Sequence, residues 1–166
     1  YEKAKWFNHE WIKKLPAAAL REPVAQAFAH RSVKITDDQL LDKVIELVKE
    51  RCHLLTDFTE QGAFFFRKPQ QYDLDAVKPK WNEAKQSFFA ALIRSFELSA
   101  NWDAHNLETG FKEMAAARQI KPGELLLPLR IMLVGGKFGP GVFQIAELLG
   151  KEETVARIQY FLTLMK

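Results

Sequence analysis

The sequence lacks the features that mark secreted, membrane-spanning or disulfide-stabilised proteins. Cys52 is its only cysteine, so no intramolecular disulfide can form, which is typical of a reducing compartment. The longest apolar run, residues 125–134, is interrupted by Pro128 and Arg130 and is too short to cross a membrane. The first residues carry neither an initiator methionine nor the apolar stretch of a signal peptide. We therefore expect a piece of a larger cytoplasmic protein, monomeric and without a membrane partner.

The sequence also lacks the residue patterns of a catalytic or metal site. No glycine-rich phosphate loop is present, and His9, His30, His53 and His105 are too scattered for metal-ligand spacing. Cys52 and His53 are adjacent, and adjacent residues of a helix point about 100° apart, so they do not form a catalytic dyad. Paired carboxylates fall at helix starts, where they complement the helix dipole. These absences argue against a free-standing enzyme and against a cofactor or metal ion bound by this chain.

Apolar residues recur at helical spacing along most of the chain, and no stretch alternates long enough to predict a strand. The sequence therefore predicts an all-α fold. Proline marks the interruptions: Pro16 should end the first helix, and Pro23 should divide the alanine-rich stretch after it. The segments with the clearest helical spacing are residues 37–52, 80–98, 106–118, 123–133, 142–149 and 152–165.

A short polar link divides the expected helices into two groups. Residues 99–103 lie between two long helical segments and contain Asn101 and Asp103. Links of this kind often separate compact parts of a chain. We therefore predict two small helical-bundle subdomains, residues 1–99 and residues 100–166.

The charge balance favours no partner strongly. The formal net charge is +3 and the isoelectric point is about 9.0. An excess this small fits a nucleic-acid-binding protein and an ordinary solvated surface equally well. Broad apolar stripes on the expected helices also fit a helical protein-interaction module with no RNA role. A salt titration separates the two functions, because RNA binding weakens steeply with salt and an apolar interface does not.

The last third of the chain contains an unusual series of prolines, glycines and basic residues. Pro128 and Arg130 lie inside an apolar helical run, where a core helix would carry neither. Glycines then let a ligand approach the backbone, and the helix after Gly141 offers free N–H groups at its start. Arg130 and Lys137 place positive charge beside this point. The alternative is a helical corner with capping glycines and one solvated arginine.

This series resembles the C-terminal signature of bacterial glutamyl-tRNA synthetases. The start of the chain is similar to the stretch after the catalytic lysine loop of that family, and the middle matches through residues 48–51 and 54–58. The resemblance therefore covers nearly the whole chain. The residues that carry it are Trp6-Phe7-Asn8, Trp11-Ile12, Lys121-Pro122-Gly123-Glu124-Leu125, Pro128-Leu129-Arg130, Gly135-Gly136, Gly139-Pro140-Gly141-Val142-Phe143 and Leu149-Gly150-Lys151-Glu152.

The resemblance implies an α-helical anticodon-binding region in two subdomains that recognises the three anticodon bases of the tRNA for glutamate. The parent enzyme, a glutamate–tRNA ligase, joins glutamate to that tRNA with ATP and magnesium on an N-terminal nucleotide-binding fold. The motifs of that fold are absent here. The fragment is therefore expected to bind no cofactor and to be inactive by itself.

Arg51 matches the position of an arginine that recognises the third anticodon base in discriminating members of the family. That base is cytosine for glutamate and guanine for glutamine. A guanidinium can donate to O2 or N3 of cytosine, acceptors that guanine presents differently. The alternative role for Arg51 is to complement the dipole at the end of its helix.

The resemblance also implies contacts to the first two anticodon bases. Arg130 matches the arginine of the Pro-Leu-Arg motif, and the turn of Gly139, Pro140, Gly141 and Val142 matches the segment that contacts these bases, partly through its backbone. Lys137 would add positive charge. Phe138 is either a stacking platform for a base or a buried corner residue.

This sequence departs from the family at two points of that turn. Gly135-Gly136 stands where many members have threonine and glycine, and Gly139 stands where a hydroxyl residue is frequent. These departures remove the side chains that would make a hydroxyl contact to a base, and they leave backbone contacts possible.

Overall fold

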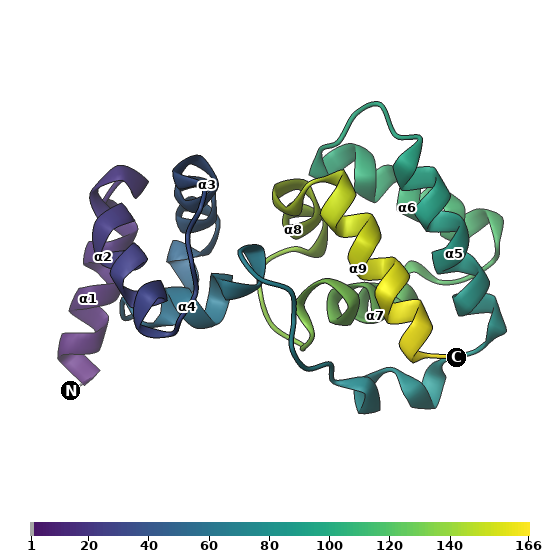
Figure 1. The fold of residues 1–166 in the computed structure, drawn as a ribbon, viewed down its shortest axis with the longest axis horizontal. Coiled ribbons are helices and arrows are strands. Elements are labelled where there is room, and N and C mark those ends of the chain that lie inside the picture. The colour runs from purple at the N-terminus through teal and green to yellow at the C-terminus, as the bar shows by residue number, and fades with distance from the viewer. Residues whose placement is uncertain (1) are drawn as a thin grey trace. The chain divides into compact units, whose positions relative to one another are not determined.

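A computed structural model describes residues 2–166, with side chains from Asn8 onward; the side chains of Trp6 and Phe7 thus lie outside the described part. No strand occurs between residues 2 and 166, which confirms the predicted all-α class. No helix in this range is long and apolar enough to cross a membrane. The chain forms two compact units, Tyr1–Lys68 and Pro69–Lys166 (Figure 1).

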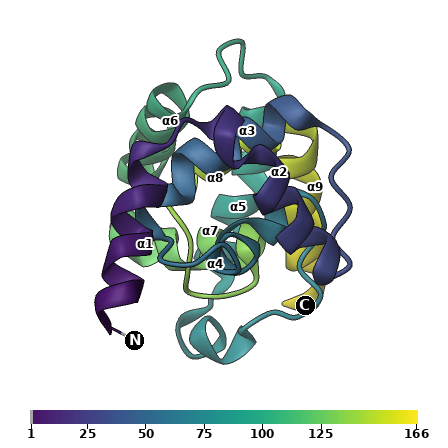
Figure 2. The same ribbon diagram turned by 90° about the vertical axis from the view of Figure 1, so that its left-hand side faces the viewer.

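The first unit is built around α2, which packs against α3 and α4 (Figures 1 and 2). Its core contains completely buried Leu20, Phe28, Leu41, Ile45 and Phe58. The elements of this unit are α1 (Glu2–Lys14), α2 (Ala17–His30), α3 (Asp38–Val48), the 3-10 turn η1 (Lys49–Arg51), α4 (Asp57–Gly62) and the 3-10 turn η2 (Ala63–Phe65).

Local sequence explains where α3 begins but not how α2 continues. The Asp37 side chain accepts hydrogen bonds from the N–H groups of Gln39 and Leu40 and so caps α3. The prediction that Pro23 divides its stretch is wrong, because α2 runs without a break from Ala17 to His30. Proline costs α2 one backbone hydrogen bond, and the buried face of Leu20, Val24 and Phe28 holds the helix together.

The second unit places α5 along α9, with α7 and α8 also packed on α9 and α6 packed on α8 (Figure 1). Aromatic rings form much of its core: Phe88 lies 5.2 Å from Phe111 and 5.2 Å from Phe89, centroid to centroid. The elements of this unit are the 3-10 turns η3 (Leu74–Ala76) and η4 (Lys78–Lys80), α5 (Glu83–Glu97), α6 (Ala104–Ala117), α7 (Pro122–Val134), α8 (Val142–Leu149) and α9 (Lys151–Leu164).

The units divide at Lys68 and Pro69, which differs from the expected boundary at residue 99. The reason is the packing of α5 on α9, a contact between helices that the expected boundary would separate. The polar link after α5 is a loop inside the second unit. Lys151 at the start of α9 donates from Nζ to the carbonyl of Ser99 at 2.5 Å and so fastens that loop.

The motif Leu149-Gly150-Lys151-Glu152 joins α8 to α9. Gly150 has a positive φ of 86°, which favours glycine, and it ends α8. Thr154 donates from Oγ1 to the carbonyl of Ala146 at 3.3 Å across this joint. The motif therefore sets the path between two helices that support the turn described next.

Candidate nucleic-acid interface

The turn from α7 to α8 comprises residues 135–141 and is called the corner here. Gly135 ends α7 with φ 91°, and its N–H donates to the carbonyl of Ile131 at 2.8 Å. A Cβ at this position would lie 2.4 Å from the carbonyl oxygen of Gln71. Glycine is thus required at position 135 for two reasons, its left-handed backbone conformation and the close approach of another segment.

That segment, residues 69–73, is called the strap here because it lies across the start of the corner. The N–H of Asp73 donates to the carbonyl of Gly135 at 2.8 Å. The Tyr72 ring lies 5.9 Å from both Tyr160 and Phe161 of α9. Burial raises the pKa of the Tyr72 phenol. The strap therefore supports the corner from the side of α9.

Arg157 of α9 also supports this end of α7. Its side chain is 3% exposed, Nη1 donates to the carbonyl of Leu133 at 2.6 Å, and Nε donates to Glu153 at 2.9 Å. The buried guanidinium thus satisfies a carbonyl that the end of a helix leaves without a backbone partner. Sequence reasoning missed this residue, because Leu133 and Arg157 come together only in the folded unit.

Arg130 binds the backbone of the corner near the start of α8. Its Nη1 donates to the carbonyls of Phe138, Gly139 and Pro140, at 2.9, 3.2 and 2.7 Å. Gly139 has a φ of 101°, a backbone conformation that L residues rarely adopt. The arginine that the sequence places at the bases is therefore engaged with the backbone of the corner.

Lys137 and Phe138 form the exposed outer part of the corner. Lys137 is exposed, and the Phe138 side chain is 44% exposed. The Phe138 ring lies against Gly136, where a Cβ would be 2.7 Å from a ring carbon. Phe138 is thus not a buried core residue, and part of its ring is open to solvent.

A cleft of about 750 Å³ lies beside the corner. It is formed by the start of α6, by one side of α7 and by the start of α8, and Arg130, Gly141 and Val142 line it together with His105, Glu108 and Gln144. The volume is within the ordinary range of small-molecule sites. His105 and Glu108 could not be predicted as lining residues, because α6 reaches the corner only through tertiary packing.

Arg51 lies in the first unit, on the 3-10 turn after α3. The helix predicted over residues 37–52 ends at Val48, so Arg51 is an exposed residue of η1 and does not lie in a last α-helical turn. His9 of α1 hydrogen-bonds through Nδ1 to the carbonyl of Cys52 at 2.7 Å, and its ring lies 4.3 Å from that of His53. Contacts from α1 thus hold the turn that presents Arg51.

Cys52 itself is completely buried beside Arg51. Its Sγ lies 3.4 Å from the carbonyl oxygen of Val48, and burial raises the pKa of the thiol to about 12. A thiol in this state is a poor nucleophile, and the Cys52 side chain is part of the core of the first unit.

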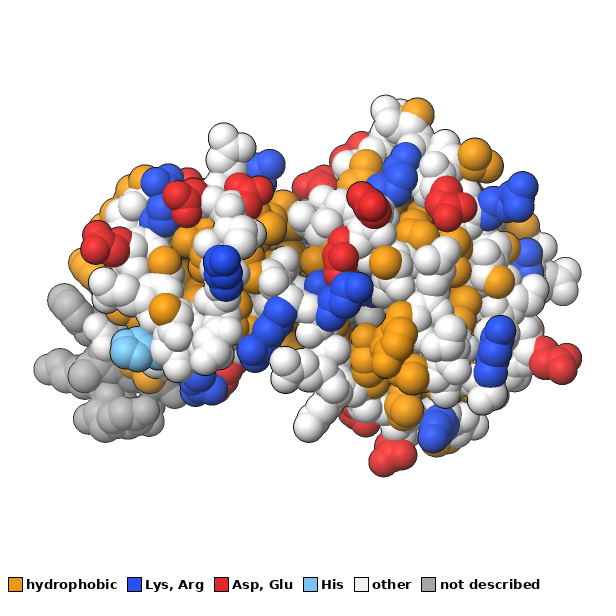
Figure 3. Space-filling model, viewed as in Figure 1, with side chains coloured by type: hydrophobic (Ala, Val, Ile, Leu, Met, Phe, Trp, Pro, Cys, Tyr) orange, Lys and Arg blue, Asp and Glu red, His pale blue; other side chains and the backbone are white. Residues whose placement is uncertain are grey.

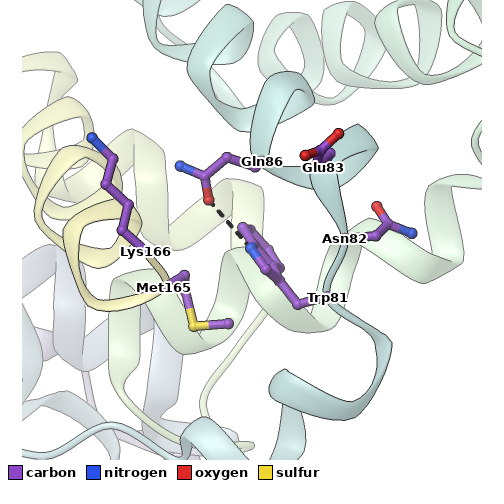
Figure 4. Close-up of a pocket in the computed structure, with 6 residues that line it drawn as sticks. All are labelled: Trp81, Asn82, Glu83, Gln86, Met165 and Lys166. Atoms are coloured by element: carbon purple, nitrogen blue, oxygen red, sulfur yellow. Dashed lines mark hydrogen bonds between the residues drawn. The ribbon is translucent and has the colours of Figure 1, made fainter.

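A second cleft, of about 330 Å³, lies between the start of α5 and the end of α9 (Figure 4). Its wall includes the Trp81 ring, whose Nε1 donates to Oε1 of Gln86 at 3.2 Å, and the Met165 side chain. None of the residues that the sequence predicts as RNA contacts lines it.

Figure 3 draws one face of the molecule, and the charges on it are mixed. On the face that Figure 3 shows, lysine and arginine side chains alternate with aspartate and glutamate, and neither sign covers a large area. Within residues 2–166, no group of three or more His, Cys, Asp or Glu side chains is arranged to hold a metal ion. The corner and its cleft therefore offer backbone groups, an aromatic ring and a few cations, which are the means by which proteins bind unstacked bases.

Comparison with known proteins agrees with this geometry. Residues 2–162 match the family described as the anticodon binding domain, and the chain belongs to that family. Two of the relatives that it resembles are glutamate–tRNA ligases. That of Flavobacterium johnsoniae is 35% identical over 158 residues, which cover 95% of this chain and 31% of that protein; that of Chlorobaculum parvum is 31% identical over 166 residues.

Solved structures give the same result. The crystal structure of a glutamate tRNA ligase from Elizabethkingia meningosepticum, in complex with its amino acid, matches 99% of this chain with a TM-score of 0.88 at 30% identity. Glutamate-tRNA synthetase from Elizabethkingia anophelis matches 98% with a TM-score of 0.81. The chain spans about a third of the length of these relatives, and it corresponds to their C-terminal part. The resemblance to glutamyl-tRNA synthetases is thus confirmed.

Proposed function

We propose that this chain binds the anticodon loop of the tRNA for glutamate, as the C-terminal part of a glutamate–tRNA ligase. The observation that carries the proposal is the family match over residues 2–162, combined with the glycine-opened corner beside a cleft. The names of the relatives support glutamate as the amino acid of the parent enzyme.

The corner supplies the contacts for the first two anticodon bases in this proposal. Gly139, Pro140, Gly141 and Val142 lead into α8, whose first N–H groups have no partner within the helix. Phe138 is exposed enough to stack on a base, and Lys137 adds a cation for a phosphate. The cleft next to Gly141 and Val142 has room for a splayed nucleotide.

Arg51 supplies the contact for the third base. Its exposure on η1 is what a base-contacting side chain requires, and its planar guanidinium suits the acceptors of cytosine. Nearby contacts of His9 with Cys52 limit the movement of the turn. In this proposal the third base distinguishes the tRNA for glutamate from the tRNA for glutamine.

The parent enzyme would attach glutamate to its tRNA in the cytoplasm, using ATP and magnesium. In this proposal ATP and magnesium bind to the part of the enzyme outside this chain. The chain alone is then expected to bind tRNA as a monomer and to catalyse no aminoacylation.

The test is a comparison of three RNAs at near-physiological salt. Binding of the whole chain to the tRNA for glutamate should exceed binding to the tRNA for glutamine and to an unrelated tRNA, and it should weaken as salt increases. Equal binding of all three tRNAs would contradict the proposal. The sequence also allowed a helical protein-interaction module, which the comparisons do not favour; a partner whose binding is insensitive to salt would support that function instead.

A further inference from the structure

We propose that Arg130 is a positioning residue, which fixes the backbone of the corner, and that the corner contacts nucleotides through its backbone and not through the Arg130 guanidinium. The consequence for RNA rests on the proposed function, whereas the effect of Arg130 on the corner does not.

The hydrogen bonds of Arg130 are the first argument. One nitrogen, Nη1, meets three consecutive carbonyls, those of Phe138, Gly139 and Pro140, all within 3.2 Å. Hydrogen bonds from a charged donor are stronger than those between neutral groups. A guanidinium that left this position to contact a base would leave three converging carbonyl dipoles without their cation. Its bonds within the protein therefore compete with any contact to RNA.

Gly139 is the second argument. Three successive carbonyls converge on one point only if the chain bends sharply among them, and Gly139 bends it with φ 101°. A side chain at this position would strain that conformation. Arg130 and Gly139 thus form a matched pair, in which the glycine permits the bend and the arginine stabilises it. This pair accounts for a glycine at a position where the resembling family frequently has a hydroxyl residue.

The α7 end of the corner is fixed by groups other than Arg130. Arg157 holds the carbonyl of Leu133, and the strap holds Gly135 through Asp73. Arg130 holds the part of the corner beyond that end, through the carbonyls of Phe138, Gly139 and Pro140. Loss of the Arg130 side chain should therefore release this stretch and leave α7 and α8 folded.

The first experiment measures the backbone order parameters of Lys137, Phe138, Gly139 and Gly141 by NMR relaxation, on the whole chain without RNA. Rigid backbone has values of about 0.85 and flexible backbone values below about 0.6. We expect rigid values in the unaltered chain, flexible values in Arg130→Gln, and intermediate values in Arg130→Lys, whose ammonium keeps a donor. Lys137→Gln is the matched control, since it removes a cation of the corner and should leave the order parameters unchanged.

The second experiment measures binding to anticodon stem-loops that differ at one base. Arg130→Gln should weaken binding by about tenfold to every stem-loop, with the ratios between them kept within about twofold, because a loose backbone affects all contacts of the corner. A base-contacting arginine would instead change the ratio at a single position. Unchanged order parameters in Arg130→Gln, or a ratio altered at one base alone, would overturn the positioning role.

Failure of RNA binding and failure of a variant to fold have separate meanings for the two proposals. If the unaltered chain binds none of the stem-loops, the proposed function fails, and the order parameters still decide the role of Arg130. If Arg130→Gln does not fold, Gly139→Ala carries the test, because a Cβ at φ 101° should release the same stretch from Lys137 to Pro140. An ordered stretch in Gly139→Ala would then overturn the proposed pair.

Discussion

Arg157 of α9 donates a 2.6 Å hydrogen bond to the carbonyl of Leu133 in α7, and this bond buries a charged side chain at the base of the corner. The guanidinium also contacts Glu153, one turn earlier on α9. The packing of α7 on α9 therefore includes a polar contact at the point where α7 ends. This contact makes Arg157 a stabilising residue for the whole second unit.

Arg157→Ala should lower the free energy of unfolding by about 3 kcal/mol, because it removes a buried hydrogen-bonded charge and leaves the Leu133 carbonyl without this donor. Chemical denaturation followed by circular dichroism measures the change. Arg94→Ala is the control, since Arg94 is an exposed arginine of α5, and it should change the value by no more than about 0.5 kcal/mol. Equal effects of the two substitutions would show that Arg157 has no special role in stability.

Gly135→Ala should destabilise the chain by about 2 kcal/mol or more. The added Cβ would meet the Gln71 carbonyl at 2.4 Å, and the backbone would be strained at φ 91°. Gly110→Ala is the matched control, because nothing lies within 4 Å of a Cβ at this position of α6. Alanine is the better helix former, so Gly110→Ala should be neutral or stabilise by up to about 1 kcal/mol. Thermal unfolding measures both effects. The midpoint temperature should fall in Gly135→Ala, and it should stay unchanged or rise in Gly110→Ala.

Most of the helices were predictable from sequence, because apolar periodicity and capping are local properties. Val142–Leu149 was predicted with its observed bounds. The end of α3 at Val48 was not predicted. The 3-10 turn that follows it preserves the apolar spacing as far as Cys52, so the sequence pattern continues past the end of the α-helix. The boundary between the units was missed because the contact of α5 with α9 joins segments far apart in sequence.

The candidate site was predictable only in part, because some of its features are local in sequence and others arise only on folding. Its glycines are visible in the sequence, because positive φ and close approach restrict those positions to glycine. The partners of Arg130 are not visible, because the carbonyls of Phe138 to Pro140 converge only after the chain bends at Gly139. Whether Arg51 and the corner contact the same RNA stays a prediction.

Arg51→Gln should relax the preference for the third anticodon base and leave the fold intact, since Arg51 is exposed and outside the core. We expect the ratio of binding between stem-loops ending in cytosine and in guanine to fall by about tenfold, the loss typical of one specific base contact. Arg31→Gln is the control, because Arg31 is an exposed arginine at the end of α2. An unchanged ratio in Arg51→Gln would remove Arg51 from the interface.

Stability should fall at alkaline pH because of Cys52. The thiol has a pKa of about 12 in the folded chain against 9.0 for an ordinary cysteine, so the unfolded chain loses its proton first. Between pH 9 and pH 12 this difference lowers the free energy of unfolding by up to about 1.4 kcal/mol per pH unit, and below pH 9 it has no effect. The slope should be smaller in Cys52→Ala. Identical slopes in the two proteins would contradict the burial of the thiol.

Because Cys52 is buried, this chain is also well suited to site-specific labelling for spectroscopy. The single native thiol is shielded from alkylating dyes, so a cysteine introduced at Lys137 would be the one labelled residue of the folded protein. A second introduced cysteine, at Arg31, would allow energy transfer across the molecule. Such a donor–acceptor pair would report how far the two helical units move when an RNA hairpin is added.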